Sequence, residues 1–414
     1  LNTNGTSVAA ANYNVTSRTV AGGLVIGGGN AAIPAVAVAA NYLAADTYTN
    51  TGVAPLNVTY TVVPVSAAGC LGDAKIITIT ISPEPVISSG LNKSSCSNSP
   101  IALTLATSVA SVGAASYNIT AVTVDPGLLA GGTNVAIPAT GVAANYLAAD
   151  SYTNTTGSAL PVTYTAVPRS ATGCLGDPVV ITITINPEPV MSATLNNTIC
   201  SDIATGLILN TNGTSIGAAN YNITARSIAA GLTPNGGNVG VPAVGVAANF
   251  LASDIFTNTG AAALPVTYTV VPVSSAGCLG APIVITLTIN PEPVVSASLD
   301  ASVCSSQAIG LTLNTNGTSV SAASYNITAR TIAPGLTASG GNVVVPAAGV
   351  ANNYLVNDIY TNTGVAPLAV TYTVIPVSAA GCLGNPRVIT LTINPEPVVA
   401  STLDATVCSD ASIA

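Results

Sequence analysis

The chain has 414 residues, of which 49% are hydrophobic, 4% aromatic and only 5% charged, and its formal net charge is −8. It contains no histidine, so neither a Ser-His-Asp nor a Cys-His catalytic arrangement can be built from it. Seven Lys and Arg residues are too few for the basic surface that binds nucleic acid. Ala, Val, Thr, Ser, Asn, Gly and Pro dominate, a composition that favours short β-strands and turns over helices.

The sequence repeats itself every 104 residues, as its eight cysteines show most clearly. Such a period exceeds the roughly 30–50 residues of a helical solenoid unit and matches the size of one domain. The cysteines form two series, at 70, 174, 278 and 382 and at 96, 200, 304 and 408. The predicted domains are 1–83, which lacks its first strand, then 84–187, 188–291 and 292–395, followed by 396–414 as the first strand of a further repeat.

The repeat at 292–395 can stand for the others. Apolar residues alternate with Thr, Ser and Asn along most of it, which is typical of half-buried strands. The middle, 335–351, is rich in Gly, Ala and Val and gives no clear pattern. About seven short strands per repeat predict an all-β tandem array of immunoglobulin-like sandwiches. The strands are expected at 294–299, 309–313, 325–329, 354–361, 370–374 and 389–393, with a turn at 314–317.

A Pro-Glu-Pro segment separates consecutive repeats, at 83–85, 187–189, 291–293 and 395–397. Because two prolines fix φ, we expect a short, stiff joint whose glutamate is solvated. Strands of about ten residues predict repeats ~35–45 Å long, so that four would span on the order of 150 Å.

Several motifs together resemble a known family, the PKD-like, immunoglobulin-like repeats of very large secreted surface proteins of Bacteroidota. They are Val-Cys-Ser near the start of a repeat, Asp-Ile-Tyr-Thr-Asn-Thr-Gly from Asp358, Val-Thr-Tyr-Thr-Val-Ile-Pro from Val370, Gly-Cys-Leu-Gly from Gly381 and Ile-Asn-Pro-Glu-Pro from Ile393. The resemblance covers all four repeats. It implies an extracellular β-sandwich array, exported in many members by a dedicated outer-membrane route, and it implies no ligand.

The regular cysteines predict disulfides and an oxidising compartment. Zinc is the alternative, but the chain has no Cys-x-x-Cys and no histidine. We expect bonds inside repeats, because a sandwich can bring the hairpin before its last strand near its first strand. The other pairing, Cys70–Cys96 and its copies, would have to cross the joint. The expected bonds are Cys96–Cys174, Cys200–Cys278 and Cys304–Cys382, and their removal should loosen the repeats more than the joints.

No catalytic, cofactor or metal site is expected. Each repeat has one recurring Asp and one recurring Glu about 38 residues apart, and we interpret the Asp as a cap of a strand or turn. One Glu per joint is too little for the six to eight oxygens of a calcium site. The run Gly27-Gly28-Gly29 lacks the Lys-Ser/Thr of a phosphate loop. Gly, Pro and Asn interrupt the long uncharged stretch 19–45, so no membrane span is predicted.

The two ends of the chain are complementary in sequence. Leu1 matches Leu105, Leu209 and Leu313, so the first repeat lacks its opening strand, whereas 399–414 is an opening strand without a repeat. A strand of another copy could fill the exposed edge, and such a head-to-tail contact propagates into a filament. The same ends are expected of a window on one longer chain. In both cases Ala414 would lie beside Leu1 of the next copy, with a Cys70–Cys408 bond between copies.

These observations predict a non-enzymatic, extracellular fibre or stalk at the cell surface, whose partner is itself. The alternative is the repeat region of an adhesin that binds glycans or other cells. Adhesive sites need exposed aromatic or distinctive polar clusters, whereas the repeating tyrosines lie at core positions of strands. Near-identical repeats also favour a spacing role over a dedicated binding domain.

Overall fold

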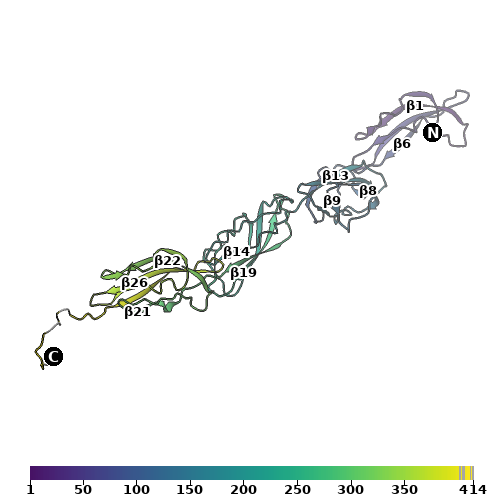
Figure 1. Cartoon of the computed structure of the whole chain (residues 1–414). Coiled ribbons are helices and arrows are strands. Elements are labelled where there is room, and N and C mark those ends of the chain that lie inside the picture. The colour runs from purple at the N-terminus through teal and green to yellow at the C-terminus, as the bar shows by residue number, and fades with distance from the viewer. Residues whose placement is uncertain (401, 403–405, 411, 413–414) are drawn as a thin grey trace. The chain divides into compact units, whose positions relative to one another are not determined.

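The computed structural model describes the chain except for residues 401, 403–405, 411 and 413–414 (Figure 1). The described residues form β-strands joined by turns, with one 3-10 helix, η1 (Ala297–Leu299). They divide into two compact units. The first comprises Leu1–Val190, Gly213–Gly217 and Ser274–Leu279, and the second comprises Met191–Asn212, Ala218–Val273 and Gly280–Ala414.

The long strands form where β-branched and aromatic residues alternate with threonine. In β26 (Leu368–Ser378) the side chains of Val370, Tyr372 and Val374 are fully buried, while the intervening threonines are half-buried. The neighbouring β27 (Arg387–Asn394) alternates in the same way. This period of two places one face of each strand in the core, as the sequence predicts.

Each of the second, third and fourth repeats has seven strands among its described residues, five in one sheet and two in another. The expected all-β array of sandwich repeats with about seven strands is confirmed. In the second repeat the strands are β7 (Lys93–Cys96), β8 (Ala114–Val124), β9 (Leu128–Ala130), β10 (Ala139–Val142), β11 (Tyr152–Asn154), β12 (Leu160–Ser170) and β13 (Val179–Asn186). In the third they are β14 (Asn197–Cys200), β15 (Asn220–Ile228), β16 (Thr233–Pro234), β17 (Ala243–Val246), β18 (Phe256–Thr257), β19 (Leu264–Val273) and β20 (Ile283–Asn290). The fourth adds β21 (Ala301–Cys304), β22 (Ala322–Ile332), β23 (Leu336–Ala338), β24 (Ala347–Val350) and β25 (Tyr360–Asn362) to β26 and β27.

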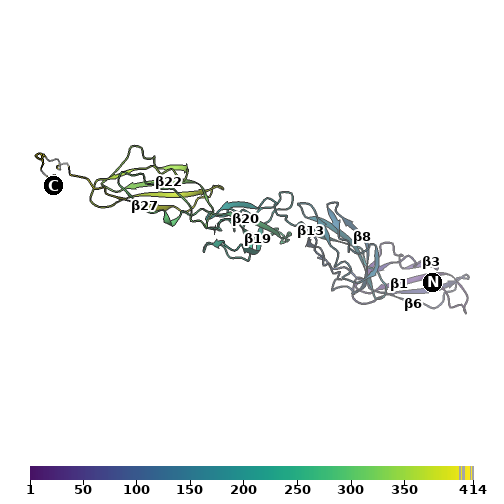
Figure 2. The same cartoon turned by 60° about the horizontal axis from the view of Figure 1, so that its bottom comes forward.

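The five-stranded sheet of the fourth repeat has the order β24-β22-β26-β27-β21, and the other two complete repeats share it. Figure 2 labels β22 and β27 in this sheet. All its pairings are antiparallel except one, in which the opening strand β21 runs parallel to the last strand β27. Its register places Cys304 opposite Asn394, at the end of the last strand. An opening cysteine therefore lies beside the joint that follows its own repeat.

The opening segment of the fourth repeat differs from the strands expected there. Residues 294–299 form a single bridge at Val295 followed by η1, and 309–313 has no ladder of its own. The stretch 309–313 nevertheless buries alternate side chains in the core, including Leu311 and Leu313, while 294–299 buries only Val295 and Leu299. The strand expected at 354–361 is shorter, since turns precede β25. The alternation at 309–313 thus predicted burial correctly and hydrogen bonding incorrectly.

The first repeat has six strands among its described residues and no counterpart of β21. Its main sheet has the order β3-β1-β5-β6, so β6 forms an edge (Figure 2). Its buried apolar core consists of five residues, whereas that of the fourth repeat has fifteen. The strands are β1 (Ala10–Val20), β2 (Val25–Ile26), β3 (Ala35–Val38), β4 (Tyr48–Thr49), β5 (Leu56–Ser66) and β6 (Lys75–Ile81).

A buried aspartate lies inside each of the second, third and fourth repeats. In the fourth, Asp358 accepts hydrogen bonds from the Tyr372 hydroxyl at 2.6 Å and from the Val343 amide at 2.8 Å, and it lies 3.7 Å from Arg330. Burial, followed by the hydrogen bond to Asp358, raises the pKa of Tyr372 far above its ordinary value, so this phenol stays a donor. The aspartate expected to cap a strand or turn is instead an acceptor inside the core.

We predict that Asp358→Ala destabilises the fourth repeat by about 3–5 kcal/mol, because the buried Tyr372 hydroxyl and the partly buried Val343 amide lose their acceptor and Arg330 loses its ion-pair partner. Asp300→Ala is the control, since this side chain is 52% exposed and also pairs with an arginine. It should cost about 1 kcal/mol or less. Hydrogen exchange of the β22 and β26 amides in the full chain measures the loss of stability in each variant. Equal losses of protection in the two variants would contradict a buried structural role for Asp358.

Candidate functional site: the joint between repeats

The joint between the third and fourth repeats is packed. Pro291 and Pro293 are buried, and Glu292 is only 3% exposed. In the first unit, Pro83 and Pro85 of the corresponding joint are also buried. The solvated glutamate expected from sequence is therefore wrong for Glu292, and the joint is part of the folded structure instead of a bare linker.

Backbone hydrogen bonds cross this joint. The Glu292 amide donates to the Asn258 carbonyl at 3.0 Å, and the Val320 amide of the fourth repeat donates to the Gly260 carbonyl at 2.9 Å. The Asn258 side chain fixes that turn by donating to the carbonyls of Ile289 and Ala262. The joint between the first and second repeats has the same two backbone bonds, from Glu84 to Asn50 and from Val112 to Gly52.

A short hairpin between β26 and β27 carries the second cysteine of the fourth repeat. The Ser378 hydroxyl accepts from the Cys382 amide at 3.1 Å, while the Ser378 amide donates to the Cys382 carbonyl at 2.9 Å. Gly381 has φ +80°, a conformation that favours glycine. These contacts hold the cysteine in one position, where it is fully buried.

The hairpin also covers the preceding joint. A Cβ atom at Gly384 would overlap the carbonyl oxygen of Pro293. In the first unit, a Cβ at Gly176 would likewise overlap the carbonyl oxygen of Pro85. Glycine in the Gly-Cys-Leu-Gly motif is therefore needed because the hairpin contacts the Pro-Glu-Pro backbone directly.

Two disulfides join consecutive repeats. Cys200 at the end of β14 is bonded to Cys382, with a Cα–Cα distance of 5.4 Å, and this bond lies in the second unit. Cys96 at the end of β7 is bonded to Cys278, with a Cα–Cα distance of 5.5 Å, and this bond lies in the first unit. Each bond spans 182 positions and links an opening strand to the hairpin of the next repeat. The predicted bonds Cys96–Cys174, Cys200–Cys278 and Cys304–Cys382 are wrong, as is the alternative of Cys70–Cys96 and its copies.

Strand direction explains the error. Cys200 pairs in register with Asn290 at the end of β20, whereas Cys278 precedes the start of that strand at Ile283. Eight residues of strand extend about 27 Å, while bonded cysteines need Cα atoms within about 7 Å. The two cysteines of one repeat therefore lie at opposite ends of its sheet. A parallel opening strand leaves no mark in the sequence pattern, so the pairing could not be predicted.

Four cysteines are unpaired in the described chain. Cys70, Cys304 and Cys408 are exposed and Cys174 is half-buried, in contrast to the fully buried Cys278 and Cys382. The expected Cys70–Cys408 bond concerns two molecules, and it stays a prediction.

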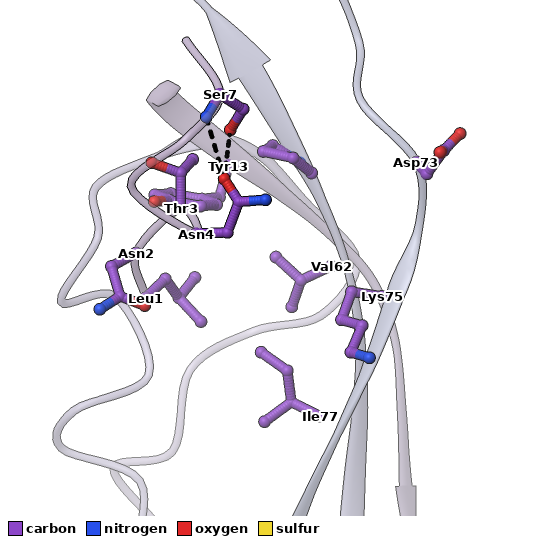
Figure 3. A pocket seen from close by; sticks show the side chains of 11 residues that line it. Leu1, Asn2, Thr3, Asn4, Ser7, Tyr13, Val62, Asp73, Lys75 and Ile77 are labelled. Atoms are coloured by element: carbon purple, nitrogen blue, oxygen red, sulfur yellow. Dashed lines mark hydrogen bonds between the residues drawn. The ribbon is translucent and has the colours of Figure 1, made fainter. Parts of the chain in front are cut away.

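The first repeat has a groove where the other repeats have their opening segment. Figure 3 shows the side chains of Leu1, Val62 and Ile77 around this space. The groove has a volume of about 540 Å³, and a second cavity of about 310 Å³ also reaches Leu1 and Ile77. Ile79 of β6 is 45% exposed, whereas its counterpart Leu391 in the fourth repeat is 1% exposed. The groove is thus a sandwich core open to solvent.

The joint in the second unit also buries a carboxyl group beside a like charge. Burial of Glu292, followed by the nearby charge of Asp202, raises its pKa from 4.5 to about 7. Asp202 itself accepts a hydrogen bond from the Thr257 hydroxyl. Ionisation of Glu292 therefore destabilises the joint between the third and fourth repeats.

The recurring aspartates and joint glutamates do not form one site in the second unit, since Asp358 lies in the core of the fourth repeat and Glu292 lies at the joint. Among the described residues, no three Cys, Asp or Glu side chains are grouped as metal ligands would be. No helix in the described part of the chain combines the length and the apolar character of a membrane span.

The fold and the joints define a tandem array of covalently linked β-sandwich repeats. The PKD-like domain family matches residues 31–85, 93–189, 197–293 and 301–397. The chain therefore belongs to the PKD-like domain family, as its motifs suggested. A search of curated proteins found no match.

Solved structures to which the chain is similar include Drosophila N-cadherin EC1-4, with 12% identity, a TM-score of 0.19 and 83% of each chain covered. Another is the Bacteroides ovatus protein SGBP-B in complex with a mixed-linkage heptasaccharide, with 12% identity, a TM-score of 0.16 and coverage of 75% of this chain and 71% of that one. The sialic acid binding region of a Streptococcus sanguinis adhesin has 12% identity, a TM-score of 0.18 and coverage of 75% and 78%.

We predict that the joint between the third and fourth repeats weakens as the pH rises. The pKa of Glu292 is raised to about 7 in the folded chain. The stability that protonated Glu292 contributes to the joint is therefore fully present below pH 4.5 and is lost as the pH rises through about 7. The loss should be at most roughly 3 kcal/mol. Hydrogen exchange of the Val320 amide at pH 5 and pH 8, corrected for the intrinsic exchange rate, measures it.

Glu292→Gln should remove this pH dependence, and Glu396→Gln, at an exposed position, should retain it. The same change in Val320 protection between pH 5 and pH 8 in both variants would show that Glu292 does not control the joint.

Proposed function

We propose that this chain is part of an extracellular stalk whose PKD-like repeats follow one another head to tail, and that it maintains length under tension. The observation that carries the proposal is the bond between Cys200 and Cys382 across a buried joint. A bond inside a repeat would protect that repeat alone, whereas a bond between repeats resists their separation. The proposal assigns no catalysis to the chain.

An extracellular location is supported by the disulfides, because such bonds persist in oxidising compartments. The tandem arrangement of PKD-like repeats is consistent with a surface protein. The domain limits 84–187, 188–291 and 292–395 divide the chain at its joints, and we propose them as the units of the stalk.

The two bonds shorten the covalent path through the chain. Their spans overlap, since Cys200 lies inside the first and Cys278 inside the second. From Cys96 to Cys382, the path through both bonds uses only the residues between Cys200 and Cys278. That is about 80 residues, or roughly 270 Å when extended, against roughly 1,000 Å along the backbone from Cys96 to Cys382.

Head-to-tail continuation is supported by the groove of the first repeat. The Leu1 amine donates to the Ala40 carbonyl, just as the Leu313 amide donates to the Asn352 carbonyl in the fourth repeat. The groove therefore begins where an opening segment would precede Leu1. A strand added to the β6 edge would restore the five-stranded sheet of the other repeats.

The adhesin alternative, in which the repeats bind glycans or other cells, stays a prediction from the sequence. A glycan array probed with the 414-residue chain tests it. Specific, saturable binding would favour the adhesin over a purely mechanical stalk.

We predict that the disulfides limit extension of the chain under force. When the ends are pulled by single-molecule force spectroscopy, the oxidised chain should release roughly 700 Å less than the reduced chain between Cys96 and Cys382. The Cys200→Ser/Cys382→Ser variant is the matched control, since its remaining bond still closes one loop. It should show an intermediate extension. Equal contour lengths in oxidised and reduced chains would refute the tension-bearing role.

A further inference from the structure

The unpaired Cys304 occupies the same local structure as the bonded Cys200. It faces Asn394 across the parallel pair β21–β27, as Cys200 faces Asn290. The following serine, Ser305, accepts from the Asn362 amide at 2.8 Å, and Ser201 accepts from the Asn258 amide at 2.8 Å. Cys304 is exposed, and thus presents one preformed half of an inter-repeat bond.

The unpaired Cys70 presents the other half. Its amide donates to the Ser66 hydroxyl at 3.1 Å, and the Ser66 amide donates to the Cys70 carbonyl at 2.9 Å, as in the Cys382 hairpin. The Gly72 amide donates to the Pro64 carbonyl at 2.9 Å, as the Gly384 amide does to Pro376. The hairpin therefore has its bonded geometry although Cys70 itself is exposed.

The C-terminal segment carries the sequence of an opening segment. Val398, Val399, Val407 and Cys408 correspond to Val294, Val295, Val303 and Cys304. All four are exposed at the end of the chain, whereas Val295 is buried in its own repeat. Residues 401, 403–405, 411 and 413–414 of this segment lie outside the described part of the chain.

We propose that the groove of the first repeat binds residues 396–414 of a second copy of this chain, and that two disulfides, Cys304–Cys70 and Cys408–Cys174, lock the contact. This inference rests on the proposed head-to-tail function. It follows from the register of the bonded pairs, in which an opening cysteine is bonded to the hairpin of the next repeat. It replaces the Cys70–Cys408 bond expected from sequence.

The period fixes these partners. Leu1 of the second copy takes position 417 of a continued numbering, because it matches Leu313 and the period is 104. Cys70 of that copy then stands 182 positions after Cys304, and Cys174 stands 182 positions after Cys408, which is the separation of both observed bonds. Each bond forms when two thiols lose two protons and two electrons to a disulfide oxidant, which becomes two thiols.

These bonds would create two continuous covalent paths along the assembly. One runs from Cys70 to Cys96, crosses to Cys278, continues to Cys304 and crosses to Cys70 of the next copy. The other follows the remaining four cysteines in the same manner. Each path uses about 26 residues, or roughly 90 Å, for every two repeats. Because two repeats of ~35–45 Å occupy nearly that length, an oxidised stalk could not lengthen appreciably even if its repeats unfolded.

Two double variants of the 414-residue chain distinguish the pairings. The purified chains are incubated with oxidised glutathione and separated by non-reducing electrophoresis. Cys70→Ser/Cys304→Ser should keep a covalent ladder through Cys408–Cys174, and Cys70→Ser/Cys408→Ser should lose it. The Cys70–Cys408 pairing, with Cys174–Cys304 as its companion, predicts the reverse. Both variants change an exposed Cys70, and circular dichroism checks that they fold alike.

Wild-type chain should give a ladder that reductant collapses to one band at 40.3 kDa, with Cys304–Cys70 and Cys408–Cys174 peptides found by mass spectrometry. Sedimentation then tests head-to-tail association separately from the disulfides. Oligomers that form without any disulfide between copies, or with a different cysteine pairing, would overturn the proposed disulfides but not the association. Monomers at all concentrations overturn both.

Discussion

The parallel pairing of the opening strand with the last strand is the constraint on which the joints depend. In the fourth repeat β21 follows β27 to its end, so that Cys304 lies at Asn394, next to the following Pro-Glu-Pro. An antiparallel opening strand of the same sequence would place the cysteine at the other end of the sheet. The direction of four residues thus decides whether a disulfide closes one repeat or couples two.

The same opening segment also completes the core. Residues before β22 supply Val295, Leu299 and Leu313 to the apolar cluster of the fourth repeat. In the first repeat Ile79 of β6 is exposed, whereas its counterpart Leu391 is buried in the fourth repeat, which indicates how much of this face the opening segment covers. Folding of a complete repeat and presentation of its cysteine to the next are therefore properties of one stretch of chain.

The sequence predicted the sandwich because alternation at Val370, Tyr372 and Val374 reports burial directly. It did not predict the disulfides, since period-two alternation carries no information on whether neighbouring strands are parallel. The burial of Glu292 was missed for a related reason: flanking prolines indicate stiffness, while the packing of the joint includes the contact between the hairpin of the next repeat and Pro293. The glycine of Gly-Cys-Leu-Gly was the available signal, because only a close backbone contact requires it at Gly384.

Coupling repeats instead of closing them changes what local unfolding can do. The third repeat lies inside both loops, because Cys200 and Cys278 are each bonded to a cysteine of a neighbouring repeat. If its sandwich opened, its two cysteines would still be held to Cys382 and Cys96, so extension between those two positions would be limited to the residues between Cys200 and Cys278. The bonds also restrict the unfolded chain, which favours refolding in place. Stability of the fold and resistance to extension therefore have the same covalent origin.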